Sequence, residues 1–428
     1  MPQEQRNKPF TIPKHLIYSA WKEVRENRGS AGIDKVSIKE YGETLGTNLY
    51  KLWNRMSSGS YFPPPVKLVE IPKKGGGKRP LGIPTVEDRI AQSAVVLCIT
   101  ERLDREFHEN SYAYRPKRSA HDAITVARQR CWRYDWVLDM DISKFFDTID
   151  QDKLMMAVKR HIKERWILLY IERWLKVPYE TVQGERIERK MGVPQGSIIG
   201  PVLANLYLHY VFDKWMSIHY SHIPFERYAD DTICHCRTKA EAEEMQIVIK
   251  NRLSLCKLKL NEEKTKIVYC KDSGRRGEHE NVSFDFLGYT FQPRATRNSK
   301  TKVNFTGFLP AISQKSKKHI HETIRGWSLK SMKKMPELAI QMEASARGWI
   351  NYYGKFYKSK MEKVLQALNH AIARWARRRY KRFKGSIKRA WLWVIKCYKE
   401  NPKLFYHWSK GVTPYYFKLK LVKIRRAE

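Results

Sequence analysis

Two adjacent carboxylates, Asp230 and Asp231, lie inside an apolar alternating segment and constrain this chain more than any other feature. The flanking segments 225–228 and 232–236 read as short strands, which places the aspartates at the tip of a tight hairpin. Two neighbouring negative charges are costly there without a cation, and hard divalent cations such as Mg2+ take oxygen ligands. Alone, the pattern is equally compatible with a solvated Asp-Asp turn.

A third carboxylate follows a second predicted strand. Residues 137–142 alternate apolar and acidic residues, so Asp139 and Asp141 share one face. An acidic strand face is ordinarily solvated. If this strand ends beside the hairpin, however, Asp141, Asp230 and Asp231 form a three-carboxylate metal site suited to phosphoryl transfer.

Seven further motifs follow one another along the chain. They are GSAGID at 29–34, the hairpin with three glycines at 71–84, SYAYRP with SAHDA at 111–123, GVPQGS at 192–197, LNEEKTK at 260–266, FLGY at 286–289 and RGWINYY at 347–353. Together with the aspartate segments, this ordered series resembles the reverse transcriptases, specifically the intron-encoded reverse transcriptase and maturase of bacterial group II introns. The resemblance covers nearly the whole chain.

The resemblance implies a right-hand polymerase of the α+β class. Fingers and palm combine an antiparallel sheet with helices, and an all-helical thumb, called domain X in maturases, precedes a basic helical C-terminal region. Strand and helix patterns alternate in the palm, as is typical of this class. The expected divisions are an N-terminal fingers extension at 1–60, fingers at 61–135, palm with the catalytic site at 136–300, thumb at 301–384 and a nucleic-acid-binding region at 385–428.

Local signals agree with these divisions. Residues 1–60 carry two helical patterns, and Thr85 opens a helix. Its apolar stripe is predicted to include Ile90, Ala94, Leu97 and Cys98.

The resemblance assigns the chemistry to Asp141, Asp230 and Asp231. Asp141 and Asp230 are expected to bind two Mg2+ ions, with Mn2+ as an alternative, together with the backbone carbonyl of Ile142, while Asp231 helps to hold the site. The primer 3′-hydroxyl then attacks the α-phosphate of the nucleotide in line, and no side chain acts as nucleophile.

The same resemblance predicts contacts with the incoming dNTP. Lys73 and Arg79 flank the glycine turn and are expected to clamp the triphosphate, Arg as a planar fork and Lys as a point charge; the alternative is a solvated basic hairpin. Phe146 is expected under the sugar, where its ring would clash with a 2′-hydroxyl and select deoxynucleotides. Phe145 is its neighbour, and either ring could instead pack in the core.

Two further dNTP contacts are predicted. Gln195 lies between Pro194 and Gly196, a context suited to an exposed loop that offers an amide to the sugar or base pair. Lys264 matches a lysine near the triphosphate, although a basic residue at a helix end is more often simply solvated.

Nucleic-acid contacts are predicted in three places. Arg115 is expected to contact the template or the triphosphate, and Leu287, Gly288 and Tyr289 resemble the primer grip. The third group consists of cations interleaved with aromatic residues near the C-terminus: Arg374, Arg377, Arg378, Arg379, Lys381 and Arg382. Such mixtures suit RNA contacts, while the nearby Trp391 and Trp393 are expected to pack in the core.

Composition agrees with a nucleic-acid enzyme. The formal net charge is +38, and residues 311–428 contain 30 Lys and Arg against six Asp and Glu. Such an excess favours polyanionic partners, because neutralised phosphates release condensed counterions. Group II intron RNA or another RNA template, a DNA primer or target and dNTPs are the expected partners.

The cysteines and the hydropathy pattern indicate a cytoplasmic protein that does not enter a membrane. The seven cysteines have no CxxC spacing, and the cysteines of Cys234-His235-Cys236 are expected to pack rather than to bind metal. No signal core or membrane-length apolar run is present.

The function expected from the sequence is an RNA-directed DNA polymerase that binds a group II intron RNA, assists its splicing and copies it into DNA during retrohoming. The chain shows no His and Cys endonuclease module, which predicts the compact class. One alternative is a domesticated relative acting in DNA repair, phage defence or a CRISPR locus. Another is a noncatalytic splicing factor, which the intact Asp141, Asp230 and Asp231 disfavour.

Overall fold

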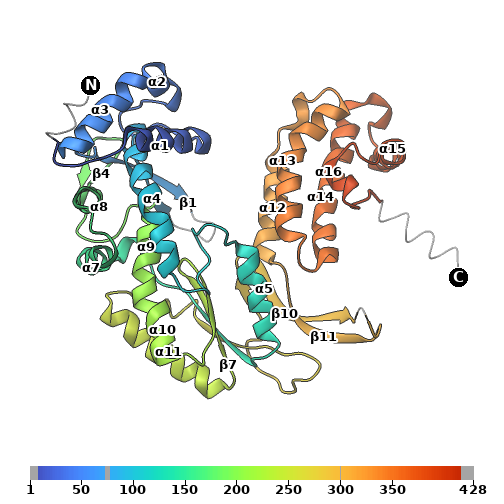
Figure 1. The fold of residues 1–428 in the computed structure, drawn as a ribbon. Coiled ribbons are helices and arrows are strands. Elements are labelled where there is room, and N and C mark those ends of the chain that lie inside the picture. Colours follow the sequence, from blue (N-terminus) through green and yellow to red (C-terminus); the bar gives the residue numbers. More distant parts are fainter. Residues whose placement is uncertain (1–7, 73–77, 299, 416–428) are drawn as a thin grey trace, which may run out of the picture. The chain divides into compact units, whose positions relative to one another are not determined.

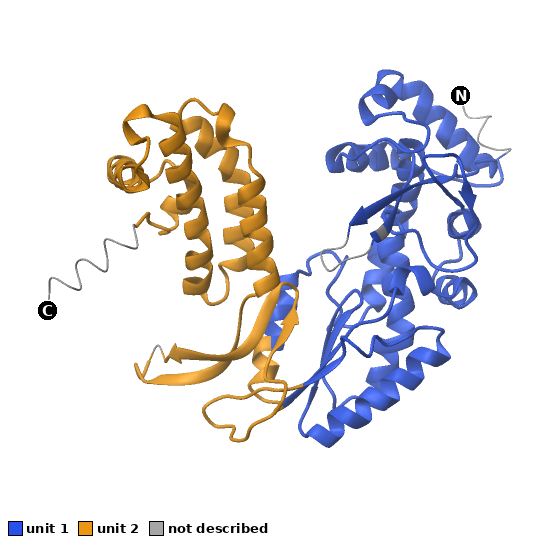
Figure 2. Ribbon diagram, turned by 180° about the vertical axis from the view of Figure 1, so that it is seen from behind, with its two compact units in different colours: residues 1–127, 136–267 blue, residues 128–135, 268–428 orange. Residues whose placement is uncertain are grey.

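The computed structural model describes residues 8–72, 78–298 and 300–415 (Figure 1). The chain forms two compact units, coloured separately in Figure 2. Residues 1–127 and 136–267 make the first unit, and residues 128–135 and 268–428 make the second. Within the described residues, no helix has the length and apolar character needed to cross a membrane.

The first unit mixes helices and strands, as expected of an α+β fold. Its elements are α1 (Lys14–Asn27), α2 (Ile38–Glu43), α3 (Leu45–Ser58), β1 (Val66–Pro72), β2 (Lys78–Ile83), α4 (Val86–Glu106), α5 (Ala120–Cys131), β3 (Trp136–Met140), α6 (Phe145–Thr148), α7 (Gln151–His161), α8 (Arg165–Lys176), β4 (Tyr179–Glu180), β5 (Arg186–Ile187), α9 (Gly200–Leu208), the π-helix η1 (His209–Asp213), α10 (Lys214–His219), β6 (Phe225–Tyr228), β7 (Asp231–Cys236), α11 (Lys239–Leu255) and β8 (Lys266–Tyr269). The chain passes from the first unit to the second within α5, returns just before β3, and passes to the second again within β8.

Two four-stranded sheets organise this unit. One has the order β2-β1-β4-β5, in which β1 and β2 form the antiparallel hairpin predicted around the glycines. The other has the order β6-β7-β3-β8, and α11 packs on its strands β3 and β7. Five consecutive residues of β7, Thr232–Cys236, are buried, including both cysteines and His235. A central strand covered on both faces accounts for this burial, and it confirms that Cys234 and Cys236 pack as free thiols.

Helix α4 begins after Thr85, whose side chain accepts a hydrogen bond from the Asp88 amide, as the sequence predicted. The predicted apolar stripe is only half right, because Ile90 and Ala94 are buried whereas Leu97 is 37% exposed and Cys98 is also exposed. The first half of α4 is buried around almost its whole circumference. A helix covered on all sides has no single stripe, so its periodicity misleads.

The second unit joins a three-stranded sheet to a helical bundle. Its strands pair antiparallel in the order β11-β10-β9, and the helices pack around a common core that includes Leu338, Leu368 and Trp391. The expected helical character beyond about residue 310 is confirmed. Its elements are β9 (Phe284–Phe286), β10 (Tyr289–Arg297), β11 (Asn304–Ile312), α12 (Gln314–Gly326), the 3-10 helix η2 (Leu329–Ser331), α13 (Met335–Tyr353), α14 (Lys358–Arg379), the 3-10 helix η3 (Lys381–Phe383), α15 (Ile387–Glu400) and α16 (Tyr406–Ser409).

A buried ion pair crosses the core of the first unit. Arg227 on β6 binds Asp213, the last residue of η1, through two hydrogen bonds of 2.6 and 2.5 Å, and both side chains are fully buried. Its remaining N–H groups reach Ser111, Asn205 and the carbonyl of Ala229. The guanidinium is therefore paired with a carboxylate and hydrogen-bonded on every nitrogen, as a buried charge requires.

We predict that Asp213→Asn lowers the free energy of unfolding of the first unit by about 3–5 kcal/mol, because the Arg227 charge stays buried without its counterion. Denaturant titration followed by tryptophan fluorescence measures the loss. Arg105→Ala is the control, since Arg105 and Glu101 form an exposed pair whose removal is expected to change stability by at most about 1 kcal/mol. Equal effects of the two variants would contradict the role assigned to Asp213.

Candidate active site

The two adjacent aspartates lie at the tip of the β6–β7 hairpin. Tyr228 pairs with Asp231 across it, so Ala229 and Asp230 form the connecting turn. Ala229 has a φ of +57°, a left-handed conformation that costs an L-residue free energy. Its carbonyl accepts a 3.2 Å hydrogen bond from Arg227, which holds the turn in this conformation. Asp230 is half-buried and Asp231 is exposed, so both carboxylates are at the surface.

Strand pairing brings the third aspartate to the same edge. In the antiparallel β3–β7 pair Met140 lies opposite Thr232, so the next residues outward are Asp141 and Asp231. The sequence expectation that Asp141 ends its strand beside the hairpin is confirmed by this register. The backbone of Asp141 accepts a 2.8 Å hydrogen bond from the amide of Asn261, which ties this edge to the segment before β8.

One cation neighbours all three carboxylates. The ammonium of Lys264 lies 2.8 Å from Asp141 Oδ2, and Asn261 donates to the same oxygen at 2.9 Å. The pKa of Lys264 is raised, chiefly by this hydrogen bond and further by the charges of Asp141, Asp231 and Asp230. Lys264 is 67% exposed, so the site opens to solvent.

The donor set suits a hard divalent cation. The carboxylates of Asp141, Asp230 and Asp231 come to one edge from two chain segments, and such ligands favour Mg2+ over softer metals. Within the described residues, no three or more Asp, Glu, His or Cys side chains already stand as a formed metal-ligand group. The Lys264 ammonium instead neutralises Asp141, and Ile142, whose carbonyl was predicted as a ligand, is buried and bridged to Leu260.

Of the two neighbouring phenylalanines predicted to contact the dNTP, Phe145 is buried and Phe146 is partly accessible. Phe145 is only 2% exposed, so its ring packs in the core; the dNTP contact predicted for it is not compatible with that burial. Phe146 is half-buried and meets Phe145 edge-on at 5.3 Å between ring centroids. Of the two, only Phe146 presents surface to a ligand.

The loop carrying Gln195 is fixed from two sides. The side-chain amide of Gln195 donates to Asp147 Oδ1 at 2.9 Å. The backbone carbonyl of Gln195 accepts a hydrogen bond from the backbone amide of Gly82 in β2 at 2.7 Å. Gly196 has a φ of +105°, and a Cβ there would lie 2.4 Å from the Gly82 carbonyl oxygen. Glycine is therefore required at this close approach.

A buried carboxylate that the sequence analysis did not single out supports this loop. Asp88 is buried and accepts hydrogen bonds from Tyr61, Trp174 and Gln92, and burial raises its pKa to about 6. The side-chain oxygen Oε1 of Gln92 in turn accepts hydrogen bonds from the backbone amides of residues 198 and 199. An acidic residue and a glutamine one turn apart in a helix are the available signal, but that spacing is common on solvated helices.

Lys73 and Arg79, the two residues predicted to clamp the triphosphate, lie at the border of the described residues. Strand pairing places Ile71 opposite Arg79 and Pro72 opposite Lys78. Lys73 and the glycines lie outside the described residues, as does the side chain of Arg79.

The predicted nucleic-acid contact of Arg115 stays a prediction, and in this conformation its side chain is bound within the protein. Its side chain is 6% exposed and forms an ion pair with Asp104 at 2.6 Å. The guanidinium also donates to the carbonyls of residues 104, 108 and 111. Arg115 thus closes the chain segment after α4, and its donors are directed to the protein rather than to solvent.

The segment predicted as the primer grip forms a tight turn within the second unit. Tyr289 is fully buried and its hydroxyl donates to the Tyr352 carbonyl, so its side chain packs internally, contrary to the predicted contact. Leu287 and Gly288 both have positive φ and remain half-buried. The Leu287 carbonyl accepts from the Tyr352 hydroxyl at 2.8 Å, which attaches the turn to α13.

The basic cluster near the C-terminus is exposed as predicted. Its members lie on the last turns of α14 and on η3, and all are solvent-exposed: Arg374, Arg377, Arg378, Arg379, Lys381 and Arg382. Trp391 is 1% exposed and Trp393 packs against the same core, which confirms their structural role.

Comparison with known proteins agrees with this geometry. Residues 71–291, more than half of the chain, match the family of reverse transcriptases (RNA-dependent DNA polymerases), and residues 317–402 match the group II intron, maturase-specific domain. The chain is 31% identical to Protein YkfC of Escherichia coli (strain K12), over 64% of this chain and 78% of that protein.

Two further similarities are to an intron-encoded protein and to a solved structure. The group II intron-encoded protein LtrA of Lactococcus lactis subsp. cremoris is 31% identical over 47% of this chain, which spans only 33% of LtrA. Among solved structures, a telomerase of Candida albicans in complex with a TWJ fragment of telomeric RNA aligns at 13% identity with a TM-score of 0.47, over 88% of this chain and 68% of that chain.

The two family matches together cover the aspartate edge and the helical bundle, and the chain therefore belongs to the reverse transcriptases that carry a group II intron maturase domain.

Proposed function

We propose that this protein copies RNA into DNA at the aspartate edge of its first unit and that its second unit binds a group II intron RNA, assisting its splicing and its retrohoming. The observation that carries the proposal is the β3–β7 register, which sets Asp141 opposite Asp231 and beside Asp230. The intron as partner is supported by the match to the maturase-specific domain and by the likeness to LtrA, whose name describes it as intron-encoded.

Reverse transcriptases generally use a divalent metal ion. In the proposed site Asp141 and Asp230, with the carbonyl of Ile142, would hold two Mg2+, and Asp231 would add negative charge beside them. When bound, the ions supply Lewis-acid stabilisation of the attacking and leaving oxygens. The Lys264 ammonium, which lies 2.8 Å from Asp141 Oδ2, would balance negative charge at this edge and is proposed to approach the triphosphate.

The neighbouring residues position the nucleotide. Phe146 borders the sugar, and the Gln195 loop, held by Asp147 and Gly82, borders the nascent base pair. The proposed partners are an RNA template, a DNA primer or target and dNTPs. Lys73 and Arg79 are proposed to neutralise the triphosphate from the fingers hairpin.

We predict that Asp141→Asn or Asp230→Asn lowers primer extension on an RNA template by at least about a thousandfold, because several kcal/mol of transition-state stabilisation depends on the metal ligands. RNA affinity is expected to stay within about twofold of the wild type. Single-turnover extension and filter binding measure the two quantities. Asp152→Asn, an exposed change in the first turn of α7, is the control, and near-normal extension by either site variant would refute the mechanism.

Phe146→Val is expected to raise the incorporation of ribonucleotides relative to deoxynucleotides by about tenfold or more, because loss of roughly 1.4 kcal/mol of discrimination corresponds to a factor of ten. Single-turnover extension with each nucleotide gives the ratio. Phe145→Leu serves as the control for core disturbance and should leave the ratio near its original value. A Phe146→Val ratio equal to that of the control would return Phe146 to a packing role.

Replacing Arg377, Arg378 and Arg379 by Ala is expected to weaken binding of structured RNA and to flatten its log-log salt dependence by roughly two to three units, about one for each phosphate that is no longer neutralised. Extension on a short preannealed duplex should fall much less. Substituting Ala for Arg105, Lys159 and Lys239 removes the same charge at positions that pair with glutamates. If both triple variants lose affinity equally, only net charge matters and the α14 arginines have no particular role.

A further inference from the structure

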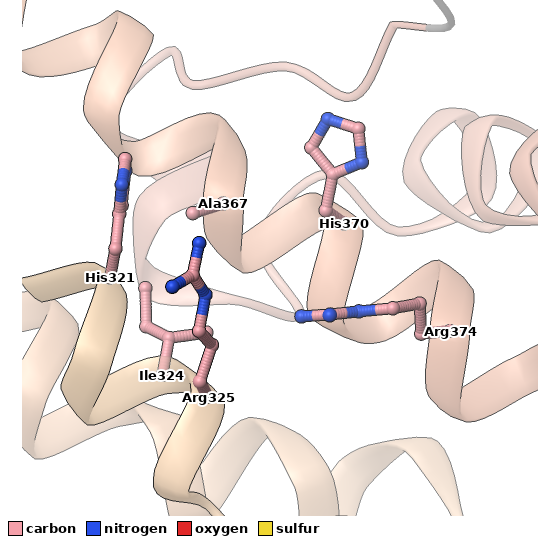
Figure 3. A pocket seen from close by; sticks show the side chains of 6 residues that line it. All are labelled: His321, Ile324, Arg325, Ala367, His370 and Arg374. Atoms are coloured by element: carbon pink, nitrogen blue, oxygen red, sulfur yellow. The ribbon is translucent and has the colours of Figure 1, made fainter.

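A groove runs between α12 and α14 of the second unit. A cavity of about 280 Å³ and an adjoining one of about 820 Å³ share Ile324, Arg325 and Arg374 in their walls. Figure 3 shows the side chains of Arg325 and Arg374 extending toward one another from the two helices. The groove is therefore cationic at the point where the two cavities meet.

The cations of this groove follow two helical stripes. His321 and Arg325 are one turn apart on α12, and His370, Arg374 and Arg378 occupy successive turns of α14. Because residues four apart share one face, each helix turns a continuous row of cationic or imidazole groups to the groove.

These charges lack internal counterions. Among the described residues, none of Arg325, Arg374 and Arg378 lies within ion-pair distance of a carboxylate. The only acidic residue of α12, Glu322, faces Lys318, and the only one of α14, Glu362, faces Lys358. Three guanidinium groups at one groove therefore present an unneutralised field, which favours an anionic ligand.

The groove also has an apolar and aromatic lining. Ile324 and Ala371 lie between the charged rows, and Trp327 and Trp375 line the larger cavity. Trp327 stacks on Trp349 with 5.8 Å between centroids, and the Trp375 indole donates to the Met332 carbonyl at 3.1 Å. Both indoles are thus fixed by their own neighbours. Trp375 is buried at 4% exposure, so the aromatic surface of the cavity wall comes from the half-buried Trp327.

We infer that this groove is a binding site for unpaired nucleotides of RNA, with Arg325 and Arg374 holding a phosphate and the aromatic part of the wall receiving a base. The inference rests on the proposed RNA binding by the second unit and names the form of RNA that is bound. Bases of a duplex stay inside the stack and cannot enter a concave pocket, whereas splayed bases of single strands can. Anionic small molecules would use the guanidinium pair but have no use for the aromatic wall.

The experiment uses the full chain and two labelled probes, a 12-nucleotide single-stranded RNA and a blunt RNA duplex of 12 base pairs. Arg325→Gln with Arg374→Gln is expected to weaken single-strand binding about tenfold or more and to lower its log-log salt slope by about 0.7, the value for the one phosphate that the pair holds. Duplex binding should change no more than in the matched control, Lys315→Gln with Lys363→Gln. These lysines are exposed, lie on the same two helices and do not line the groove.

A charge-preserving pair, Arg325→Lys with Arg374→Lys, separates geometry from charge. It should keep the salt slope near that of the wild type while single-strand affinity still falls several-fold, because lysine lacks the planar fork. If the double Gln variant unfolds early in a thermal scan, the double Lys variant tests whether the groove binds single-stranded RNA.

Equal losses on both probes would overturn the groove as a site for unpaired nucleotides. If the Gln pair matches its lysine control while the variant lacking Arg377, Arg378 and Arg379 binds RNA weakly, the groove assignment is wrong and RNA binding by this unit stands. If all variants bind as the wild type does, the proposed RNA-binding function itself fails.

Discussion

The position of the aspartate hairpin depends on the buried pair between Arg227 and Asp213. Arg227 connects the π-helix end, helix α9 through Asn205, the segment after α4 through Ser111 and the hairpin turn through the Ala229 carbonyl. A left-handed alanine costs roughly 1–2 kcal/mol. Since every nitrogen of Arg227 is used in a fully buried setting, that cost is offset and the turn has a single geometry. The π-helix belongs to this arrangement, because its last residue supplies the counterion.

A second set of buried polar contacts fixes the Gln195 loop. Asp88 has no cation partner among the described residues and instead accepts hydrogen bonds from Tyr61, Trp174 and Gln92. Burial is therefore the largest influence on the pKa of Asp88 and raises it. Gln92 transmits this fixed position to the amides of residues 198 and 199. Buried polar groups therefore set the geometry of both the aspartate edge and the Gln195 loop, while the three aspartates and Phe146 stay half-buried or exposed.

Much of this arrangement could be predicted from sequence, because strand alternation and family order specify which residues meet. The pairing of the Asp230 hairpin with the strand before Asp141 is one example. Sequence does not show where burial or internal hydrogen bonding decides the role of a side chain. The family resemblance assigned Arg115 and Tyr289 to nucleic acid, yet Arg115 donates to neighbouring carbonyls and Tyr289 packs against α13. Neither composition nor spacing reveals whether an arginine has a partner, since the partner is distant in sequence or is a backbone carbonyl.

The difference between partnered and unpartnered arginines is also what separates the two units chemically. In the first unit Arg227 and Arg115 are buried, and their charges serve to hold backbone segments together. On α14 the arginines are exposed, and the acidic residue of the same helix faces Lys358 near its other end. A cation already bound to a carboxylate gains little from a phosphate, because the exchange breaks one ion pair to make another. The cations that can release counterions and bind RNA are therefore those without a carboxylate partner, and the exposed Arg374, Arg377 and Arg378 of α14 are of this kind.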